Sequence, residues 1–221
     1  MSVRENLDAL AHHIPAGCTL VAVSKTQPVE KIQEAFDWGH RTFGENRAQE
    51  MASKYEALSK EIQWHMIGHL QTNKVKYIAP FVHLIQSVDS PKLLNEIDRQ
   101  AAKAHRIIPC LLQIHIAEEE TKFGFSLDEV AAFLGSANWD DLANVQVLGL
   151  MGMATFTDNT DQVRREFRSL RTLFEQLNSR RLPAAVRMKE LSMGMSADFR
   201  IALEEGSTMV RVGTAIFGQR L

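Results

Sequence analysis

Short apolar runs alternate with longer amphipathic segments along this sequence. Each run has the length of a buried strand, and each following segment repeats its apolar residues every three or four positions, as a helix does. Eight such pairs fit into 221 residues, at roughly 28 residues per pair. Strands that alternate with helices predict a parallel sheet with crossover helices. The predicted strands are residues 19–25, 42–46, 62–67, 84–88, 109–116, 145–150, 191–193 and 209–212.

This alternation predicts an α/β protein built as a single (β/α)8 barrel, near the small end of the usual size range. A doubly wound open sheet is the alternative, because periodicity alone does not separate a closed sheet from an open one. No linker, low-complexity stretch or repeat divides residues 1–221, so we expect one domain. Ser2 and Glu5 form a capping-box pattern, and residues 1–14 are expected to form an extra helix that packs on the barrel.

Charge and cysteine content exclude several classes of function. The net charge is −2 and the pI is about 6.5, which gives no reason to expect nucleic acid or an anionic membrane as a partner. Cys18 and Cys110 lie in or beside apolar runs, with no spacing typical of a metal site. The N-terminus lacks the apolar region of a signal peptide, and no segment approaches a membrane span. We therefore expect a cytoplasmic protein.

Lys25 stands at the carboxyl end of the first predicted strand, before Thr26-Gln27-Pro28. That end of a parallel strand faces the ligand site in barrels and in open α/β sheets. A lysine there is suited to Schiff-base formation with a carbonyl compound. A solvated lysine without chemistry is the alternative.

Small and hydroxyl-bearing residues end the last two predicted strands. Ser192 and Ser196 belong to the segment that ends the seventh strand, and Gly213 and Thr214 follow the eighth. The loops after strands seven and eight are the usual phosphate site of such barrels, and backbone amides near Met195 would point at an anion. A helix N-cap within a methionine-rich turn is the alternative for the first segment. A phosphate site together with a strand-end lysine suggests pyridoxal 5′-phosphate (PLP).

Arg211 lies on the eighth predicted strand. If its guanidinium faces the pyridine nitrogen of PLP, that nitrogen stays unprotonated, because arginine does not give up its proton. The ring is then a poor electron sink, which disfavours most carbanion chemistry. A salt bridge to Glu204 or Glu205 is the alternative.

Five segments, in order along the chain, resemble the pyridoxal phosphate homeostasis proteins, the YggS/PROSC family. They are residues 22–26 (AVSKT), 43–46 (FGEN), 64–74 (WHMIGHLQTNK), 191–199 (LSMGMSADF) and 210–218 (VRVGTAIFG). The resemblance implies a barrel like the N-terminal domain of alanine racemase, with PLP held as a Schiff base on Lys25. It also implies that Arg211 faces the ring nitrogen and that Asn46 lies beside the cofactor. The phosphate positions that it implies are Ser192, Ser196, Gly213 and Thr214.

Further residues flank the proposed mouth of the barrel. Met66 and Met195 are expected to wall the cofactor ring, and residues 121–125 could line the mouth, since racemase barrels carry a basic residue in a similar stretch. His65 and His69 have the i, i+4 spacing of metal ligands, but they sit at a strand end without an obvious third ligand. No metal site is therefore predicted. No role follows from the sequence for His69, Asn73 or Lys74.

The family is thought to bind, buffer and deliver PLP without robust catalysis. The predicted function is therefore PLP binding in vitamin B6 homeostasis, by a monomer, with apo PLP-enzymes as candidate recipients. A PLP-dependent amino-acid racemase is the alternative, and a barrel for another phosphorylated metabolite is a third. Racemase relatives take a catalytic tyrosine from a second domain, whereas this sequence ends at Leu221 and its tyrosines, Tyr55 and Tyr77, fall on predicted helices. Racemisation by two bases needs an acid on each face of the ring.

Overall fold

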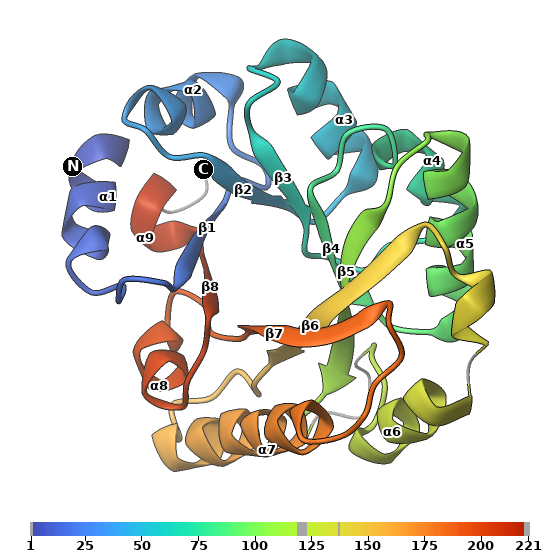
Figure 1. Ribbon diagram of the computed structural model, residues 1–221. Helices are drawn as coiled ribbons and strands as arrows, with labels where there is room; N and C mark the ends of the chain where they lie inside the picture. The colour runs from blue at the N-terminus through green and yellow to red at the C-terminus, as the bar shows by residue number, and fades with distance from the viewer. Residues whose placement is uncertain (1, 119–122, 137, 219–221) are drawn as a thin grey trace.

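The computed structural model of this chain describes residues 2–118, 123–136 and 138–218. Within them, eight parallel strands pair in chain order, and the last strand also pairs with the first, so the sheet closes into a barrel with the helices outside it (Figure 1). The closed barrel is thus confirmed against the open sheet. The strands are β1 Thr19–Val23, β2 Thr42–Glu45, β3 Gln63–Met66, β4 Leu84–Val88, β5 Ile108–His115, β6 Val145–Met153, β7 Val186–Ser192 and β8 Met209–Val212.

The helices begin where the sequence supplies caps. Ser2 and Glu5 form both hydrogen bonds of a capping box at the start of α1, and Ser126 and Glu129 do the same at α6. Ser90 caps α5 through the backbone N–H of Leu93. The helices are α1 Val3–Ala11, α2 Val29–Asp37, α3 Ala48–Ala57, α4 Val75–Ile78, α5 Pro91–Lys103, α6 Leu127–Ser136, α7 Thr160–Asn178, α8 Phe199–Glu204 and α9 Thr214–Phe217, with 3-10 turns η1 Thr72–Lys74 and η2 Trp139–Asp141.

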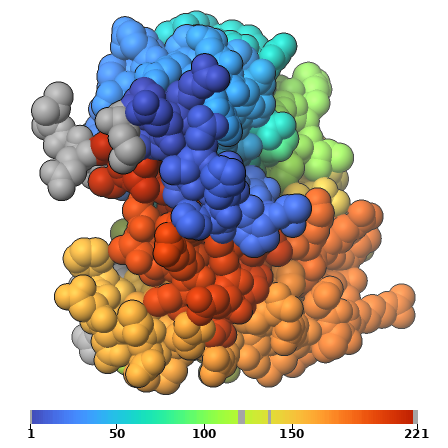
Figure 2. All heavy atoms as spheres, turned by 90° about the vertical axis from the view of Figure 1, so that its left-hand side faces the viewer, coloured from blue at the N-terminus to red at the C-terminus, as the bar shows by residue number. Residues whose placement is uncertain are grey.

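Helix α1, which precedes the first strand, packs beside the last helix of the chain, α9. Helix α1 lies against α2 and α9, with Val3, Leu7 and Leu10 buried (Figures 1 and 2). The side-chain amide of Asn6 donates a hydrogen bond to the carbonyl of Ile216 at 2.8 Å. Helix α9 has only four residues, so α1 supplies apolar cover next to it. None of the described helices is long and apolar enough to cross a membrane.

Both apolar and polar side chains fill the barrel interior. One buried cluster joins residues from five strands, namely Val21, Leu84, Leu111, Met151 and Met209. Alternate residues of a strand share a face. The inward positions two residues further along β4 and β8 are therefore Gln86 and Arg211, and both side chains are buried.

Two strands are longer than the residue ranges predicted for them. β6 continues to Met153 and β7 begins at Val186. Gly149 and Gly152 weaken the strand signal at the end of β6, because glycine has low strand propensity. The start of β7 alternates buried Val186 and Met188 with exposed charged residues, and its pairing with β6 makes it a strand. Helix α6 also continues one residue past Gly135, where we expected it to stop.

Gly149 lets β6 and β7 approach each other closely. Its φ is 151°, and a Cβ atom there would lie 1.8 Å from the carbonyl oxygen of Glu190. We expect Gly149→Ala to lower the free energy of unfolding by about 1–3 kcal/mol, because the backbone must move to admit the methyl group. Urea unfolding measures this. Gly135→Ala is the control, since no atom lies within 4 Å of that Cβ, and an unchanged urea midpoint for Gly149→Ala would contradict the prediction.

Candidate functional site

The predicted site residues gather at the carboxyl end of the barrel. Lys25 lies two residues beyond β1, Asn46 directly follows β2, Met66 ends β3, Ser192 ends β7, and Gly213 directly follows β8. Because all the strands are parallel and the sheet is closed, these ends form one ring. Lys25 and Asn46 are partly exposed, whereas Met66 and Ser192 are buried.

The loops after β7 and β8 are joined to each other and lie against β1. The Ser196 hydroxyl accepts a hydrogen bond from the backbone N–H of Gly213 at 3.2 Å. A Cβ atom on Gly213 would lie 3.1 Å from the carbonyl oxygen of Val23. Thr214 opens α9 directly after this contact. The proposed phosphate loops therefore stand beside the strand that leads to Lys25.

Arg211 is buried inside the barrel, with 3% of its surface exposed. Its Nη1 donates to the Ser192 hydroxyl at 2.6 Å, and its Nη2 donates to the carbonyl of Gly152 at 2.9 Å. Burial lowers the pKa of Arg211 to about 10, against the opposing charge of Asp198, so the guanidinium stays protonated at neutral pH.

The alternative partners of Arg211 are engaged elsewhere. Glu204 and Glu205 form ion pairs with Arg164, and Glu205 also pairs with Arg168. The salt bridge from Arg211 to Glu204 or Glu205 is thus the wrong alternative. Arg211 points inward because β8 places it two residues along from Met209 of the interior cluster.

A chain of hydrogen bonds continues from Arg211 across the barrel. The Ser192 hydroxyl donates to Gln86 Oε1 at 2.7 Å, and Gln86 Nε2 lies 2.9 Å from His65 Nδ1. Burial lowers the pKa of His65 to about 3, with a smaller contribution from His83. His65 is therefore neutral, and its Nδ1 can accept from the Gln86 amide. Gln86 was missed at the sequence level, where its only signal is a polar residue within an apolar strand.

Besides the Ser196 hydroxyl and the Gly213 amide, which are bonded to each other, two more groups expected to bind phosphate have protein partners. The Ser192 hydroxyl is held between Arg211 and Gln86. The backbone N–H of Met195 donates to Asp198 Oδ1 at 2.5 Å. Burial raises the pKa of Asp198, although that hydrogen bond and the charge of Arg211 oppose the shift. The roles of Ser192 and Met195 toward a phosphate stay predictions.

A second polar cluster lies behind the Lys25 turn. Lys54 of α3 donates to Glu45 Oε1 at 2.8 Å, to Glu50 Oε1 at 2.7 Å and to the carbonyl of Ser24 at 2.8 Å. The Ser24 hydroxyl also donates to Glu45 Oε1 at 2.6 Å. Sequence reasoning missed this cluster, because the spacing of Glu50 and Lys54 is that of an ordinary surface ion pair.

Other residues near the mouth are placed as follows. A cavity of about 210 Å³ beside the ends of β2 and β3 is lined in part by Asn46, Met66, His69 and Lys74. His69 Nδ1 lies 2.9 Å from Asp89 Oδ2, and its ring stacks on that of Phe123. Among the described residues, no group of three or more histidine, cysteine or acidic side chains could hold a metal. Residues 121 and 122 lie outside the described part of the chain.

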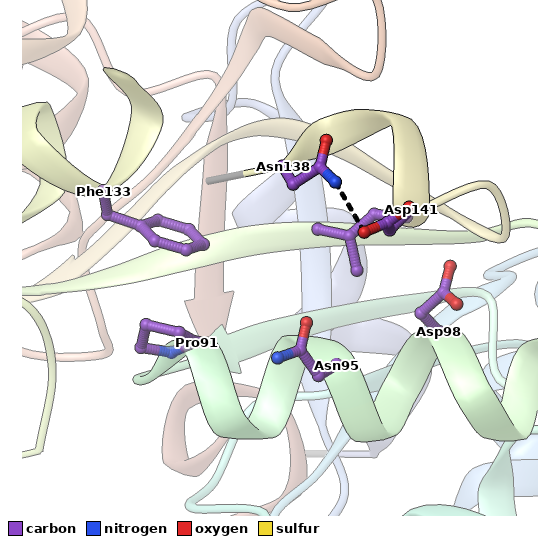
Figure 3. Close-up of a pocket in the computed structure, with 7 residues that line it drawn as sticks. Pro91, Asn95, Asp98, Phe133, Asn138 and Asp141 are labelled. Carbon is purple, nitrogen blue, oxygen red and sulfur yellow. Dashed lines mark hydrogen bonds between the residues drawn. The ribbon is translucent and has the colours of Figure 1, made fainter. Parts of the chain in front are cut away.

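A further cavity of about 560 Å³ lies on the outside of the barrel (Figure 3). Asn95 and Asp98 of α5 face Phe133 and Asp141 across it. Its carboxylates have local partners, since Asp98 accepts from the backbone N–H of Asn144 and Asp141 accepts from the amide of Asn138. None of the predicted site residues lines this cavity.

Comparisons with known proteins agree with this geometry. Residues 1–221 match the family described as "Alanine racemase, N-terminal domain". The pyridoxal phosphate homeostasis protein of Aquifex aeolicus is 43% identical over 202 residues, which cover 91% of this chain and 86% of that protein. The human protein of the same name is 38% identical over 211 residues, which cover 91% of this chain and 76% of that protein.

Solved structures resemble this one over nearly its whole length. PipY of Synechococcus elongatus without PLP is 35% identical with a TM-score of 0.91, and the alignment covers 98% of this chain and all (100%) of that one. PipY with PLP bound has a TM-score of 0.88 at 34% identity, with the same coverage. Alanine racemase of Bartonella henselae is 15% identical with a TM-score of 0.71, covering 98% of this chain and 58% of that one. This last likeness shows the fold alone.

The neutral state of His65 makes stability depend on pH. Its pKa is about 3 in the folded chain and about 6.5 when unfolded, so the unfolded state takes up a proton first as the pH falls. Unfolding free energies from urea titrations at pH 7 and pH 5 should fall by about 2 kcal/mol more in the wild type than in His65→Asn. His12→Asn, at an exposed position, is the control, and equal losses in wild type and His65→Asn would refute the assignment.

Proposed function

This chain belongs to the family of pyridoxal phosphate homeostasis proteins, and we propose that it binds PLP as a Schiff base on Lys25. It holds the cofactor for buffering or for delivery to apo PLP-enzymes, as part of vitamin B6 homeostasis in the cell. The observation that carries this proposal is the ring of strand ends that brings Lys25 beside the loops after β7 and β8. PipY, a relative with the same barrel, has been solved with PLP bound.

The residues at the mouth fit PLP by their chemistry. An aldehyde condenses with a neutral lysine amine to form a carbon–nitrogen double bond, and one water molecule leaves. Lys25 supplies the amine. Ser196, Gly213 and Thr214 supply small or hydroxyl-bearing positions for the phosphate, in two loops that are hydrogen-bonded to each other. Asn46 and Met66 line a cavity next to the same mouth, where they would flank the ring.

Arg211 favours storage over turnover. Its guanidinium is fixed by Ser192 and Gly152 and keeps its proton at neutral pH. A pyridine nitrogen that faces it would remain unprotonated, which leaves the ring a weak electron sink. Tyr55 stacks on Phe81 and Tyr77 lies on α4, so both tyrosines sit on helices outside the strands. We therefore propose binding without robust catalysis.

The proposed working unit is one chain in the cytoplasm. All the residues assigned to the cofactor come from a single barrel, which supports a monomer. Cys18 and Cys110 are free thiols. Unpaired cysteines are usual in a reducing compartment. The negative net charge gives no basis for nucleic acid as a partner.

Lys25→Ala is expected to abolish covalent attachment of PLP, because no other amine is assigned to the aldehyde. Protein incubated with PLP is reduced with borohydride, and the modified peptide is located by mass spectrometry. Lys189→Ala, an exposed lysine on β7, is the control and should retain a stoichiometric adduct. A pyridoxyl adduct on a lysine other than Lys25 in the wild type would overturn the assignment.

The PLP-loaded wild type should not exchange the α-proton of alanine or serine at enzymatic rates, which are typically about 1–1000 per second. Exchange is followed by NMR in deuterated water, with free PLP as the reference. A rate in that range, lost in Lys25→Ala, would establish a racemase-type enzyme instead.

A further inference from the structure

The turn that carries Lys25 is held in place by charged side chains of neighbouring elements. We propose that Glu50 and Lys54 are positioning residues, which fix the backbone on both sides of Lys25 and thereby aim its amine for covalent attachment of PLP. The proposal rests on the function proposed above and assigns that site two residues which do not contact the cofactor.

The turn contains a strained residue directly after Lys25. Thr26 has a φ of 63°, in the left-handed region that β-branched residues rarely adopt. The backbone N–H of Gln27 donates to the carbonyl of Ser24 at 3.0 Å, so Lys25 and Thr26 occupy the two central positions of a tight turn. Such strain persists only where surrounding contacts over-determine the conformation.

Those contacts come from α3 and β2. The backbone N–H of Thr26 donates to Glu50 Oε1 at 2.6 Å, and the carbonyl of Ser24 accepts from Lys54 Nζ at 2.8 Å. Both residues that flank Lys25 are thus bound through their backbone to one ion pair. The Ser24 hydroxyl and backbone N–H are held as well, by Glu45 and by the carbonyl of Gly44.

Burying the charges of Glu45 and Lys54 costs free energy, so stability of the fold does not by itself explain this cluster. The Glu45 side chain is fully buried and that of Lys54 is 7% exposed. Glu45 Oε2 has no hydrogen-bond partner among the described residues. Replacing buried ion pairs by apolar residues is often neutral or stabilising in proteins. What the ion pair provides here is a fixed direction for the turn, since Lys54 contacts its backbone as well as both carboxylates.

Glu50 is ionised in this arrangement. Its burial would raise its pKa, but the hydrogen bonds from Lys54 and from the Thr26 amide outweigh that effect and lower the pKa. A charged acceptor makes a stronger hydrogen bond to a backbone amide than a neutral one. The charge on Glu50 therefore strengthens the contact that holds Thr26 at its positive φ.

The test separates positioning from general support of the fold by using two ligands. PLP reacts with Lys25, whereas pyridoxine 5′-phosphate has an alcohol in place of the aldehyde and binds without a covalent bond. In Glu50→Ala, covalent loading of PLP should be slower by about tenfold to a hundredfold, the cost of misplacing a reacting group. Affinity for pyridoxine 5′-phosphate should stay within about twofold of the wild type, since a twofold change is under half a kcal/mol.

Matched variants complete the design. Glu50→Gln keeps an acceptor for the Thr26 amide and should recover most of the loading rate. Glu56→Ala is the control, because Glu56 lies on the same helix as Glu50 and its ion pair, with Lys60, is exposed. This variant should load like the wild type. The double variant Glu45→Gln/Lys54→Met removes the buried charges together and releases the Ser24 carbonyl. It should load slowly, as Glu50→Ala does, and it provides the test if Glu50→Ala does not fold.

Loading is measured by borohydride quenching at timed intervals, and pyridoxine 5′-phosphate binding by calorimetry. Wild-type loading rates in Glu50→Ala and in the double variant would overturn the proposal. A variant that loses PLP loading rate and pyridoxine 5′-phosphate affinity to the same extent would also overturn it. That result would mean that Glu50 and Lys54 support the fold of the whole site. A wild-type chain that forms no adduct on Lys25 would instead defeat the proposed function, and the two failures are therefore distinguishable.

Discussion

The pairing of β8 with β1 closes the barrel, and the neighbours of every proposed site residue follow from it. Four residue pairs join the two strands, from Thr19 with Met209 to Ala22 with Val212. This pairing closes the sheet and turns eight separate strand ends into one ring. It also sets Gly213 against Val23, where a side chain larger than hydrogen would meet the carbonyl oxygen at 3.1 Å. Lys25 and the loops after β7 and β8 are neighbours only because the barrel is closed.

Two polar clusters lie at the carboxyl end of the closed barrel, and the first of them is buried. One holds Arg211 through Ser192 and continues through Gln86 to His65. The other holds the Lys25 turn through Glu50 and Lys54. Buried polar groups are costly unless they are satisfied, and satisfied ones are rigid. The two clusters thus keep the Arg211 guanidinium and the backbone of the Lys25 turn in set positions, which suits a site that retains a cofactor more than one that must change shape.

Much of the fold could be predicted from the sequence because its signals are local. The capping boxes at Ser2 and Ser126 and the apolar runs that became β4 and β8 depend on neighbouring residues alone. The early part of β7 could not, because its half-exposed pattern becomes a strand only by pairing with β6. Lys25 and the residues after the last two strands were predicted from their positions at strand ends, and the family resemblance added Asn46 to them. The partners of Arg211 and the role of Lys54 depend on which side chains a closed barrel brings together, and spacing along the chain carries no signal for that.

We propose that the carboxyl end of this barrel holds PLP covalently on Lys25. A titration of the purified protein with PLP, followed by its visible absorption spectrum, is the decisive measurement. We expect a new band distinct from that of free PLP, which saturates at one equivalent per chain and is absent in Lys25→Ala. A spectrum that remains the sum of protein and free PLP at every ratio would contradict it.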